Sequence, residues 1–339
     1  MTDGETENSS GRDAAASLHV AAAPHVSSMA LTTRRMMLDV LIGLVPVVLA
    51  SLIIFRFYAA KQLAICIASC LAAELIFTAM RRRPASVGDF SAIVTGAILA
   101  LSLPGTAPWF VGVVGSFAAI GIGKAVFGGL GQNIFNPAMV GRAFVMICFA
   151  SMMGASAYVD PSSSVDVVTQ ATPMTAAKLA PGTAGPDWPL LLRLFLGNVN
   201  GSLGETSAIA CIIGGLYLCL RRTASWEIPL GAILAATVIG GIGDLVNPAH
   251  SFTMLHHLAG GALLFGALFI ATDPVTSPLT PRGKFIFGIG LGVLVMLIRL
   301  FSGYPEGVMF SVLLMNSVVP LINRATIPRP VGGPVPAKG

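Results

Sequence analysis

Long apolar runs alternate with short polar segments over most of the 339-residue chain. The run 36–55 contains a single charged residue, Asp39, and the runs 108–123, 258–272 and 285–298 contain none. Because a spanning helix needs roughly 20 mostly apolar residues, these runs predict membrane spans. The pattern predicts about ten of them, at 36–55, 62–80, 90–103, 108–127, 138–156, 204–220, 227–246, 254–272, 284–301 and 306–323.

The composition agrees with a membrane protein. Hydrophobic residues make up 55% of the chain and charged residues only 10%, whereas soluble domains carry about 25% charged residues. Glycine (38) and proline (22) are plentiful, and within apolar segments they indicate close helix packing and interrupted helices. The expected fold class is therefore an all-α polytopic membrane protein.

The charge distribution predicts how the chain is oriented. Basic residues gather at the ends of the expected spans rather than in a stripe with aromatic residues, which argues against nucleic-acid binding. If the N-terminus is cytoplasmic, 15 of the 20 Lys and Arg residues face the cytoplasm and 5 face outside. Because basic residues are enriched in cytoplasmic loops, both termini are expected inside and the polar loop 157–188 outside.

The two halves of the chain show similar patterns. The segment 95–99 runs into a break at Leu103-Pro104, and 260–264 runs into a break at Asp273-Pro274. Each half contains five expected spans, an odd number, so the two repeats would be inverted in the membrane, as in many transporters. Chance similarity between glycine-rich segments is the alternative. The expected division is a disordered cytoplasmic tail (1–33), a first repeat (34–156), an outside loop with a re-entrant connection (157–203), a second repeat (204–323) and a cytoplasmic tail (324–339).

Three segments are too polar or too rich in Gly and Pro for ordinary spans: 128–137, 197–207 and 271–283. Irregular backbone at membrane depth is tolerated only where it is buried in protein or lines a cavity. Such segments expose peptide N–H and C=O groups, which suit a flat heteroaromatic ring with hydrogen-bonding edges. Plain interfacial turns would explain any one of the three. The five cysteines lie in apolar segments and are interpreted as small hydrophobic residues rather than metal ligands.

Several longer motifs together resemble one membrane family. They are Pro24-His25 with Ser28, Gly-Leu-Gly-Gln-Asn at 129–133, Phe-Asn-Pro-Ala-Met-Val-Gly at 135–141, Gly-Glu-Thr-Ser-Ala at 204–208, Ala-Thr-Asp-Pro-Val-Thr-Ser-Pro at 271–278 with Pro-Arg-Gly at 281–283, and Arg-Leu-Phe-Ser-Gly-Tyr-Pro-Glu-Gly at 299–307. In this order they resemble the D-subunit family of Rnf ion-translocating electron-transport complexes. That family is related to the B subunit of the sodium-pumping NADH:quinone reductase. The resemblance covers nearly the whole chain from residue 24.

The resemblance implies a covalent flavin in the outside loop. Members of the family carry FMN joined through its phosphate to a threonine, in a motif of Asp, two variable residues, Ser or Thr, usually Gly, then Ala-Thr. The matching residues here are Asp166, Thr169, Gln170, Ala171 and Thr172. Thr172 would be the acceptor. The departure is Gln170, which stands where the family usually has a glycine that can adopt a positive φ.

The resemblance also implies a noncovalent riboflavin between spans near the cytoplasmic side. Asn133 and Asn136 are the candidate contacts, because an amide side chain both donates and accepts hydrogen bonds, as the edge of an isoalloxazine requires. The alternative is that these two residues cap broken helices.

The implied function is electron relay within a multi-subunit complex of the inner membrane, coupled to Na⁺ or H⁺ translocation between the two sides. Partner subunits, including a second covalent-flavin subunit, would handle ferredoxin and NAD. Acidic residues within spans are costly and often functional, so Asp39, Glu74 and Asp244 are candidates for ion coupling, with ion pairing as the alternative. Glu205 and Asp273, at helix breaks, are expected to serve assembly or flavin placement.

Two other functions stay open from the sequence. The inverted repeat alone would also fit a stand-alone channel or solute transporter without a redox cofactor. A structural membrane anchor for a redox complex would bind no flavin but would associate with the same partners. Detection of bound flavin would distinguish an electron carrier from both a channel or transporter and a structural anchor.

Overall fold

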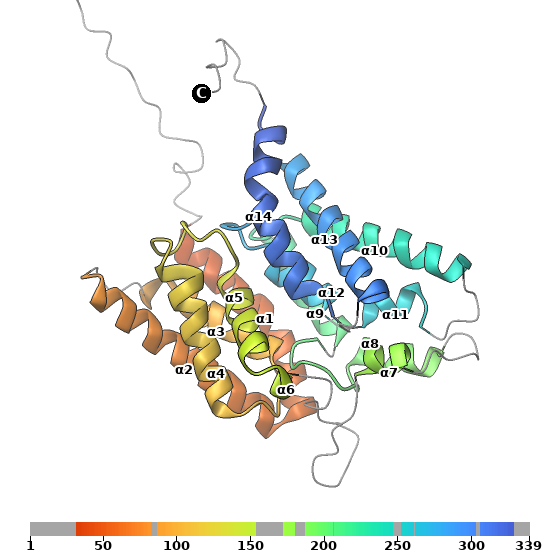
Figure 1. Ribbon diagram of the computed structural model, residues 1–339, viewed down its shortest axis with the longest axis horizontal. Helices are drawn as coiled ribbons and strands as arrows, with labels where there is room; N and C mark the ends of the chain where they lie inside the picture. Colours follow the sequence, from red (N-terminus) through yellow and green to blue (C-terminus); the bar gives the residue numbers. More distant parts are fainter. Residues whose placement is uncertain are drawn as a thin grey trace, which may run out of the picture.

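The computed structural model describes residues 32–82, 87–153, 172–179, 187–205, 207–246, 252–260, 262–302 and 306–328. Within these ranges the chain forms helices joined by turns, without β-strands (Figure 1). Of the tails expected at 1–33 and 324–339, residues 32–33 and 324–328 lie within these ranges, and α14 extends to Thr326; the rest lie outside them.

The first half of the chain forms five main helical elements, in the order expected. They are α1 (Thr33–Phe55), α2 (Phe57–Met80), α3 (Ser91–Ser102), α4 (Trp109–Ile120), which continues as the π-helix η2 (Gly121–Ala125), and α5 (Pro137–Cys148), followed by the single turn α6 (Ala150–Met153). A short 3₁₀ turn, η1 (Val87–Asp89), precedes α3.

The second half also forms helices at each of its five expected spans, but their lengths differ from those in the first half. Its elements are α9 (Ala208–Leu220), α10 (Glu227–Val246), α11 (Met254–Ala259), α12 (Leu263–Phe265) with the π-helix η4 (Gly266–Ile270), α13 (Pro281–Phe301) and α14 (Val308–Thr326). The helix is thus broken between α11 and α12, next to Gly260 and Ala262.

Every predicted span overlaps a helix or a run of helices. Five helices, α1, α2, α10, α13 and α14, are long and apolar enough to cross a membrane, and α3, α4 with η2, α5 and α9 are shorter apolar helices. Two spans expected to be continuous are interrupted. The span 138–156 is broken at Phe149, and the span 254–272 is broken beside Gly260.

Two short helices, α7 (Pro173–Leu179) and α8 (Trp188–Leu196), lie in the segment expected to be a loop and re-entrant connection, 157–203. The side chain of Asp187 accepts a hydrogen bond from the N–H of Leu190 and so begins α8. Gly197, with a φ of 107°, ends it. Nine residues are too few to span a bilayer, so hydropathy alone gives no sign of this helix.

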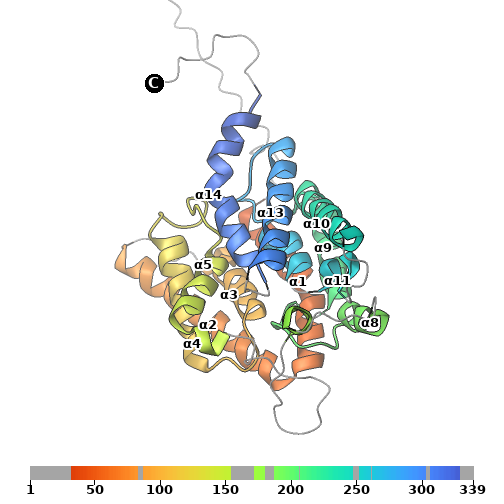
Figure 2. The ribbon, with the colours of Figure 1, turned by 45° about the vertical axis from the view of Figure 1, so that its right-hand side comes forward.

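The two halves lie side by side (Figures 1 and 2), with α1 packed along α9 and α5 against α14. Glycine permits the first of these contacts. A Cβ atom added to Gly214 would lie 2.0 Å from the carbonyl oxygen of Gly43, so only glycine lets α1 and α9 approach this closely.

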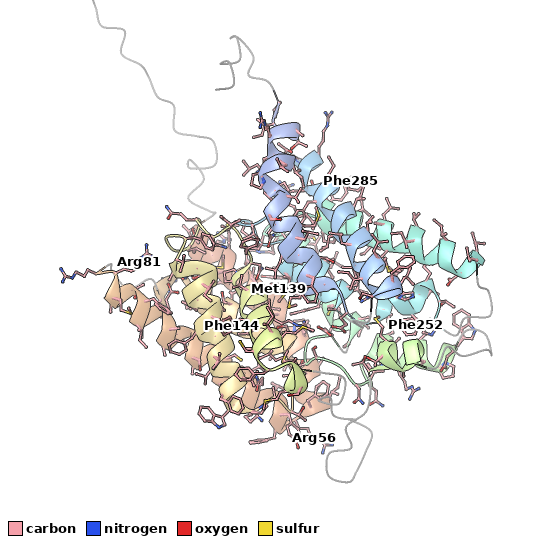
Figure 3. All side chains as sticks on the ribbon, viewed as in Figure 1. Arg56, Arg81, Met139, Phe144, Phe252 and Phe285 are labelled. Atoms are coloured by element: carbon pink, nitrogen blue, oxygen red, sulfur yellow. The ribbon has the colours of Figure 1, made fainter. Side chains whose placement is uncertain are left out.

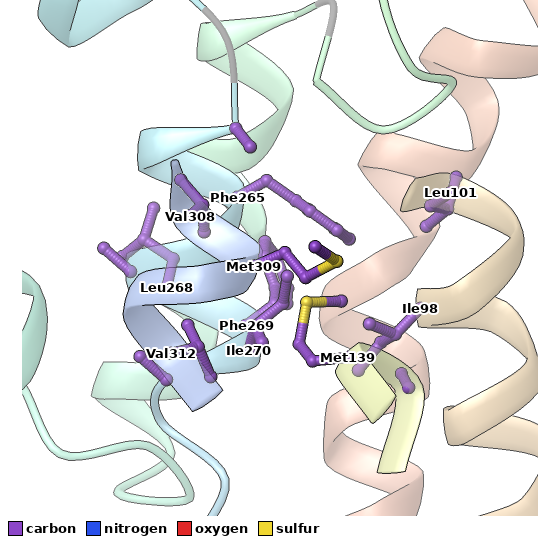
Figure 4. Packing of buried hydrophobic residues seen from close by; sticks show 14 of the residues in the cluster. Ile98, Leu101, Met139, Phe265, Leu268, Phe269, Ile270, Val308, Met309 and Val312 are labelled. Atoms are coloured by element: carbon purple, nitrogen blue, oxygen red, sulfur yellow. The ribbon is translucent and has the colours of Figure 1, made fainter. Parts of the chain in front are cut away.

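Large apolar side chains fill the space between the halves (Figure 4). Leu101 of α3 and Met139 of α5 face Phe265 and Phe269, and Val308, Met309 and Val312 of α14. Each of these is less than a tenth exposed. Figure 3 shows the described side chains on the ribbon; many large apolar ones are exposed, among them Ile53, Leu216 and Leu245, which is expected where the surroundings are lipid.

Candidate functional site

A glycine-rich loop between η2 and α5 forms the first polar element of the site. Gly128, Gly129 and Gly131 have φ values of 127°, 116° and 90°, a region that other residues rarely adopt. A Cβ atom on Gly128 would also lie 1.7 Å from Oε1 of Gln132. The loop therefore needs its glycines to turn the backbone back toward α5, and it carries Asn133 into the interior.

Asn133 is buried and only partly satisfied. Its Nδ2 atom donates a hydrogen bond to the carbonyl oxygen of Phe135 at 3.3 Å. Its Oδ1 atom is buried and has no hydrogen-bond partner among the described residues. A buried, unsatisfied acceptor costs about 1–3 kcal/mol, so a donor from a bound molecule would stabilise this position.

Asn136 has a different role. Its Oδ1 atom accepts hydrogen bonds from the N–H groups of Ala138 and Met139, at 3.1 and 3.3 Å, and so begins α5. Its Nδ2 atom donates to the carbonyl oxygen of Ile270 at 3.1 Å, across the boundary between the halves. In this structure Asn136 therefore caps a helix, which was the alternative to flavin contact. Its side-chain oxygen and nitrogen both form hydrogen bonds within the protein.

Asn316, in the middle of α14, completes this connection. Its Oδ1 atom accepts from the N–H of Asn136 at 3.1 Å, and its Nδ2 atom donates to the carbonyl oxygen of Thr276 at 3.0 Å. One buried amide therefore joins the polar segments of the two halves. The sequence analysis did not single out Asn316; an amide in an apolar helix was the available signal.

A cavity opens beside Asn133, between α3, η2, the start of α5 and the segment after η4. Its volume is about 60 Å³, whereas small-molecule sites usually enclose roughly 300–1,000 Å³. A flat ring the size of an isoalloxazine would therefore have to part the walls. Polar wall residues are Ser91, Thr95, Lys124, Asn133, Asn136, Thr223, Thr272 and Asp273.

Lys124 is the one basic residue among those that line this cavity. It lies in the π-helix η2, a form of helix common at functional sites. Its ammonium group is 2.9 Å from Oε1 of Glu74 and 2.7 Å from the hydroxyl of Ser91, and the whole residue is buried. Lys124 thus neutralises the charge of Glu74. Glu74 was a candidate for ion coupling, with ion pairing as the alternative, and in this structure it forms an ion pair.

Asp273 lies in the turn after η4, where its carboxylate accepts hydrogen bonds from the N–H of Val275 and the hydroxyl of Thr276, both at 3.2 Å. This is the arrangement expected of a carboxylate at a helix break. Burial raises the pKa of Asp273 above its ordinary value, although the two hydrogen bonds act in the opposite direction.

Glu205 lies away from this cavity, in the loop that leads into α9. Its carboxylate pairs with Arg142 of α5 at 2.9 Å. The same guanidinium lies 3.5 Å from Glu306, just before α14. Oε2 of Glu205 is buried without a hydrogen-bond partner among the described residues. Arg142 thus joins three segments that are far apart in the sequence.

The other two ion-coupling candidates also have partners. Asp39 of α1 accepts a hydrogen bond from Thr223 at 2.9 Å and pairs with Arg221 at 3.4 Å. Asp244 of α10 accepts from the N–H of Met254, the first residue of α11, at 2.9 Å. Both carboxylates therefore connect helices, and neither is a neighbour of Asn133 in the cavity.

Thr172 lies immediately before α7. Its Oγ1 atom accepts a hydrogen bond from the N–H of Thr175 at 3.2 Å and lies 2.9 Å from the Thr175 hydroxyl. The residue is buried, 5% exposed, although the sequence placed it in an exposed loop. Asp166, Thr169, Gln170 and Ala171, the rest of the proposed attachment motif, lie outside the described residues.

Comparison with known proteins adds a family context. The sequence profile of the NQR2, RnfD, RnfE family matches residues 19–332. The D subunit of the Na⁺-translocating ferredoxin:NAD⁺ oxidoreductase complex of Acetobacterium woodii is 41% identical over 320 residues, covering 93% of this chain and 95% of that protein.

The names of two further relatives describe the translocated ion differently. The D subunit of the proton-translocating ferredoxin:NAD⁺ oxidoreductase complex of Clostridium ljungdahlii is 38% identical, over 91% of this chain and 94% of its own. The D subunit of the ion-translocating oxidoreductase complex of Actinobacillus succinogenes is 37% identical, over 91% and 96%. Relatives of this chain are therefore named for different ions.

Proposed function

Because the chain belongs to the NQR2, RnfD, RnfE family, we propose that it is a membrane subunit of an ion-translocating ferredoxin:NAD oxidoreductase complex of the inner membrane. The observation that carries this proposal is the 41% identity to such a subunit over more than nine-tenths of both chains. The apolar helices support it, because they suit a multi-pass membrane subunit. Other subunits of the complex would bind ferredoxin and NAD.

Activity of the purified complex tests this function. Complex assembled with this chain should reduce NAD with reduced ferredoxin, and the rate or the membrane potential should depend on Na⁺ or on pH. Relatives named for Na⁺ and for protons are similarly identical to this chain, so the assay must vary both ions. A complex that forms and works equally well without this chain would contradict the proposal.

The architecture that goes with this function is ten spans in two inverted repeats. Matching contacts support it: α2 packs against α4 in the first half as α10 does against α13 in the second, and α4 meets α5 as α13 meets α14. The contacts of α1 with α9 and of α5 with α14 would then be the two that cross the symmetry axis.

The topology makes a direct prediction. An alkaline phosphatase domain fused after Gly339 should be inactive, because 15 of the 20 basic residues face the cytoplasm only when both termini lie there. The matched control is the same domain inserted into the loop 157–188, which should be active. Strong activity at Gly339 would contradict the proposed topology.

FMN on Thr172 is the part of the proposal that concerns covalent chemistry. The bond requires a hydroxyl, which Thr172 supplies, and when attached the flavin would pass electrons on without diffusing away. The hydroxyl is buried and bound to Thr175 in this structure. Attachment therefore requires that the start of α7 opens, or that it takes place before α7 packs.

Riboflavin beside Asn133 is the part that concerns noncovalent binding. The residues fit the chemistry, because Oδ1 of Asn133 is a buried acceptor without a described partner in a cavity that has other polar wall groups. An N–H of the flavin ring is a suitable donor to this oxygen. The protein's part is to hold the ring between the halves and to exclude water from it.

The two asparagines should respond differently to substitution. Asn133→Ala should lose most of the noncovalent flavin, because it removes the buried acceptor. Its effect on stability should be smaller than that of Asn136→Ala, since the one described hydrogen bond that it loses is the 3.3 Å bond to the carbonyl oxygen of Phe135. Asn136→Ala should destabilise the chain by about 1 kcal/mol or more through loss of the helix cap. The measurements are flavin released per chain on denaturation and the thermal midpoint in detergent. Equal flavin content in Asn133→Ala and the unmodified chain would contradict the assignment.

A further inference from the structure

The helix α8 presents an apolar face that no described part of the chain covers. Trp188, Leu192 and Leu196 are 59%, 60% and 58% exposed, and Phe195 is exposed as well. Their spacing of four, three and one residues places them on one side of the helix. The opposite side carries Leu194, which is 3% exposed. The helix is therefore apolar on both sides, yet only one side has a partner among the described residues.

The buried side of α8 connects it to the segment that begins with Thr172. Leu194 packs in one cluster with Met174 of α7, Val199 and Phe252. A second connection runs from the start of α8 to α11, where Nε2 of His256 lies 2.8 Å from the carbonyl oxygen of Asp187. Since Nδ1 of His256 accepts from the N–H of Thr253, Nε2 carries the proton and donates. The position of α8 is thus fixed against two other helices.

The surroundings of α8 indicate what covers its open face. It packs against α9, whose own surface exposes Ile209, Ile212, Ile213, Leu216 and Leu220. α8 lies at the end of the molecule opposite the C-terminal end of α14 (Figures 1 and 2). The open face of α8 therefore continues the lipid-facing surface of a membrane helix at its outer end.

We propose that α8 is an interfacial helix, with its open face in the outer leaflet of the bilayer, and that through Leu194 it holds α7 and Thr172 at the membrane surface. Interfacial helices lie in this layer with one apolar face about 5–10 Å deep, and the other apolar side of α8 is covered by the protein. Trp188 is an aromatic residue of the kind enriched at the interface. Arg193 is exposed and can reach the lipid headgroups. The outer side rests on the proposed topology.

Lipid-attached quenchers test this placement. The full chain with Trp109→Phe and Trp226→Phe has Trp188 as its single tryptophan and is placed in phosphatidylcholine nanodiscs. Bromine atoms at carbons 6 and 7 of the acyl chains should lower its fluorescence by about two-fold, more than bromine at carbons 11 and 12, because the helix is expected to lie shallow. Acrylamide in the water should quench it weakly.

Three outcomes would overturn the inference. Strong quenching by acrylamide without quenching by bromine would place the face in water. Stronger quenching by the deeper bromine would place α8 within the hydrocarbon core. Quenching in the isolated chain that disappears in the assembled complex would mean that a partner subunit covers the face. These fluorescence measurements do not require a bound flavin. If Thr172 carries no FMN but the quenching of Trp188 is as expected, only the proposed cofactor is contradicted, and the placement of α8 stands.

A paired variant checks the role of the face. Leu192→Gln with Leu196→Gln should reduce bromine quenching of Trp188, because polar side chains hold the helix less firmly in the leaflet. The matched control is Ile213→Gln on α9, which changes a lipid-facing residue outside α8 and should leave the quenching unchanged. Equal quenching in the paired variant and the control would contradict a specific contribution of α8.

Discussion

A Thr172→Ala chain produced in cells that contain the flavin-attaching enzyme should show no flavin fluorescence on a denaturing gel. The unmodified chain should give a fluorescent band at its full length. The expected loss is complete, because a phosphodiester needs a hydroxyl oxygen and alanine has none. The proposal fails if the fluorescence of the Thr172→Ala band equals that of the unmodified chain.

Three variants make this result specific. Thr172→Ser keeps a hydroxyl and should retain part of the label, whereas Thr169→Ala should keep some or all of it. Thr175→Ala removes the hydroxyl that lies 2.9 Å from the Thr172 oxygen, so it should leave labelling intact or increase it. Loss of label in Thr175→Ala would show that the Thr172–Thr175 contact is needed for attachment rather than being an obstacle to it.

Mass spectrometry of the 161–178 region locates the flavin directly. The mass of FMN should be found on Thr172. Its appearance on Thr169 would contradict the proposed position, and its absence from both threonines would contradict attachment. In that case Gln170→Gly tests the departure from the family motif, because restoring the usual glycine should restore labelling if Gln170 prevented it.

Apolar runs located the helices because lipid imposes the same requirement at every residue of a span. A helix buried in hydrocarbon needs apolar side chains along its length, so α1 and α10 could be located within a few residues of their ends. Length was also the reason that α8 was missed. Its nine residues are apolar but too few for a span, and its location next to a polar loop hid it.

Motifs identified the family, and the match over 19–332 confirms it. They could not say which polar residue has which partner. Arg142 and Glu205 are 63 positions apart and Arg142 and Glu306 are 164 apart, so only the packed helices bring them together. The two asparagines of the 128–137 loop show the same limit. From residue type alone, each could cap a helix or bind a ligand. The structure distinguishes them, because Asn136 makes hydrogen bonds to Ala138 and Ile270, whereas Oδ1 of Asn133 has no described partner.

Replacing Arg142 should strongly destabilise the membrane-embedded part of the protein. Arg142 and Glu205 are both less than a tenth exposed, and Glu306 is within 3.5 Å of the same guanidinium. Arg142→Met would leave two largely buried carboxylates without this counter-charge. Removing one partner of a buried ion pair costs about 3–5 kcal/mol, which is a large share of the stability of a folded domain.

The expected result is a lower thermal midpoint and less folded protein in detergent, measured by fluorescence-detected size exclusion after heating. Glu205→Gln added to Arg142→Met removes one of the two carboxylates that lost this partner and should recover part of the loss. Arg142→Lys keeps the charge but not the forked guanidinium that reaches both carboxylates. Its stability should therefore lie between that of the unmodified chain and that of Arg142→Met. A double variant less stable than Arg142→Met would mean that Glu205 does not depend on Arg142.

Arg221→Met is the matched control. Arg221 also pairs with a buried carboxylate, Asp39, but at 3.4 Å and with 42% of its side chain exposed. Asp39 keeps its hydrogen bond from Thr223, so this change should cost less than about 1 kcal/mol. The comparison also separates structure from transport. If Arg142→Met were as stable as Arg221→Met and the complex lost only its ion dependence, Arg142 and Glu205 would serve ion translocation rather than assembly. The expected order is a large loss of folded protein for Arg142→Met and a small one for Arg221→Met, because the cost of an unpaired charge increases with its distance from water.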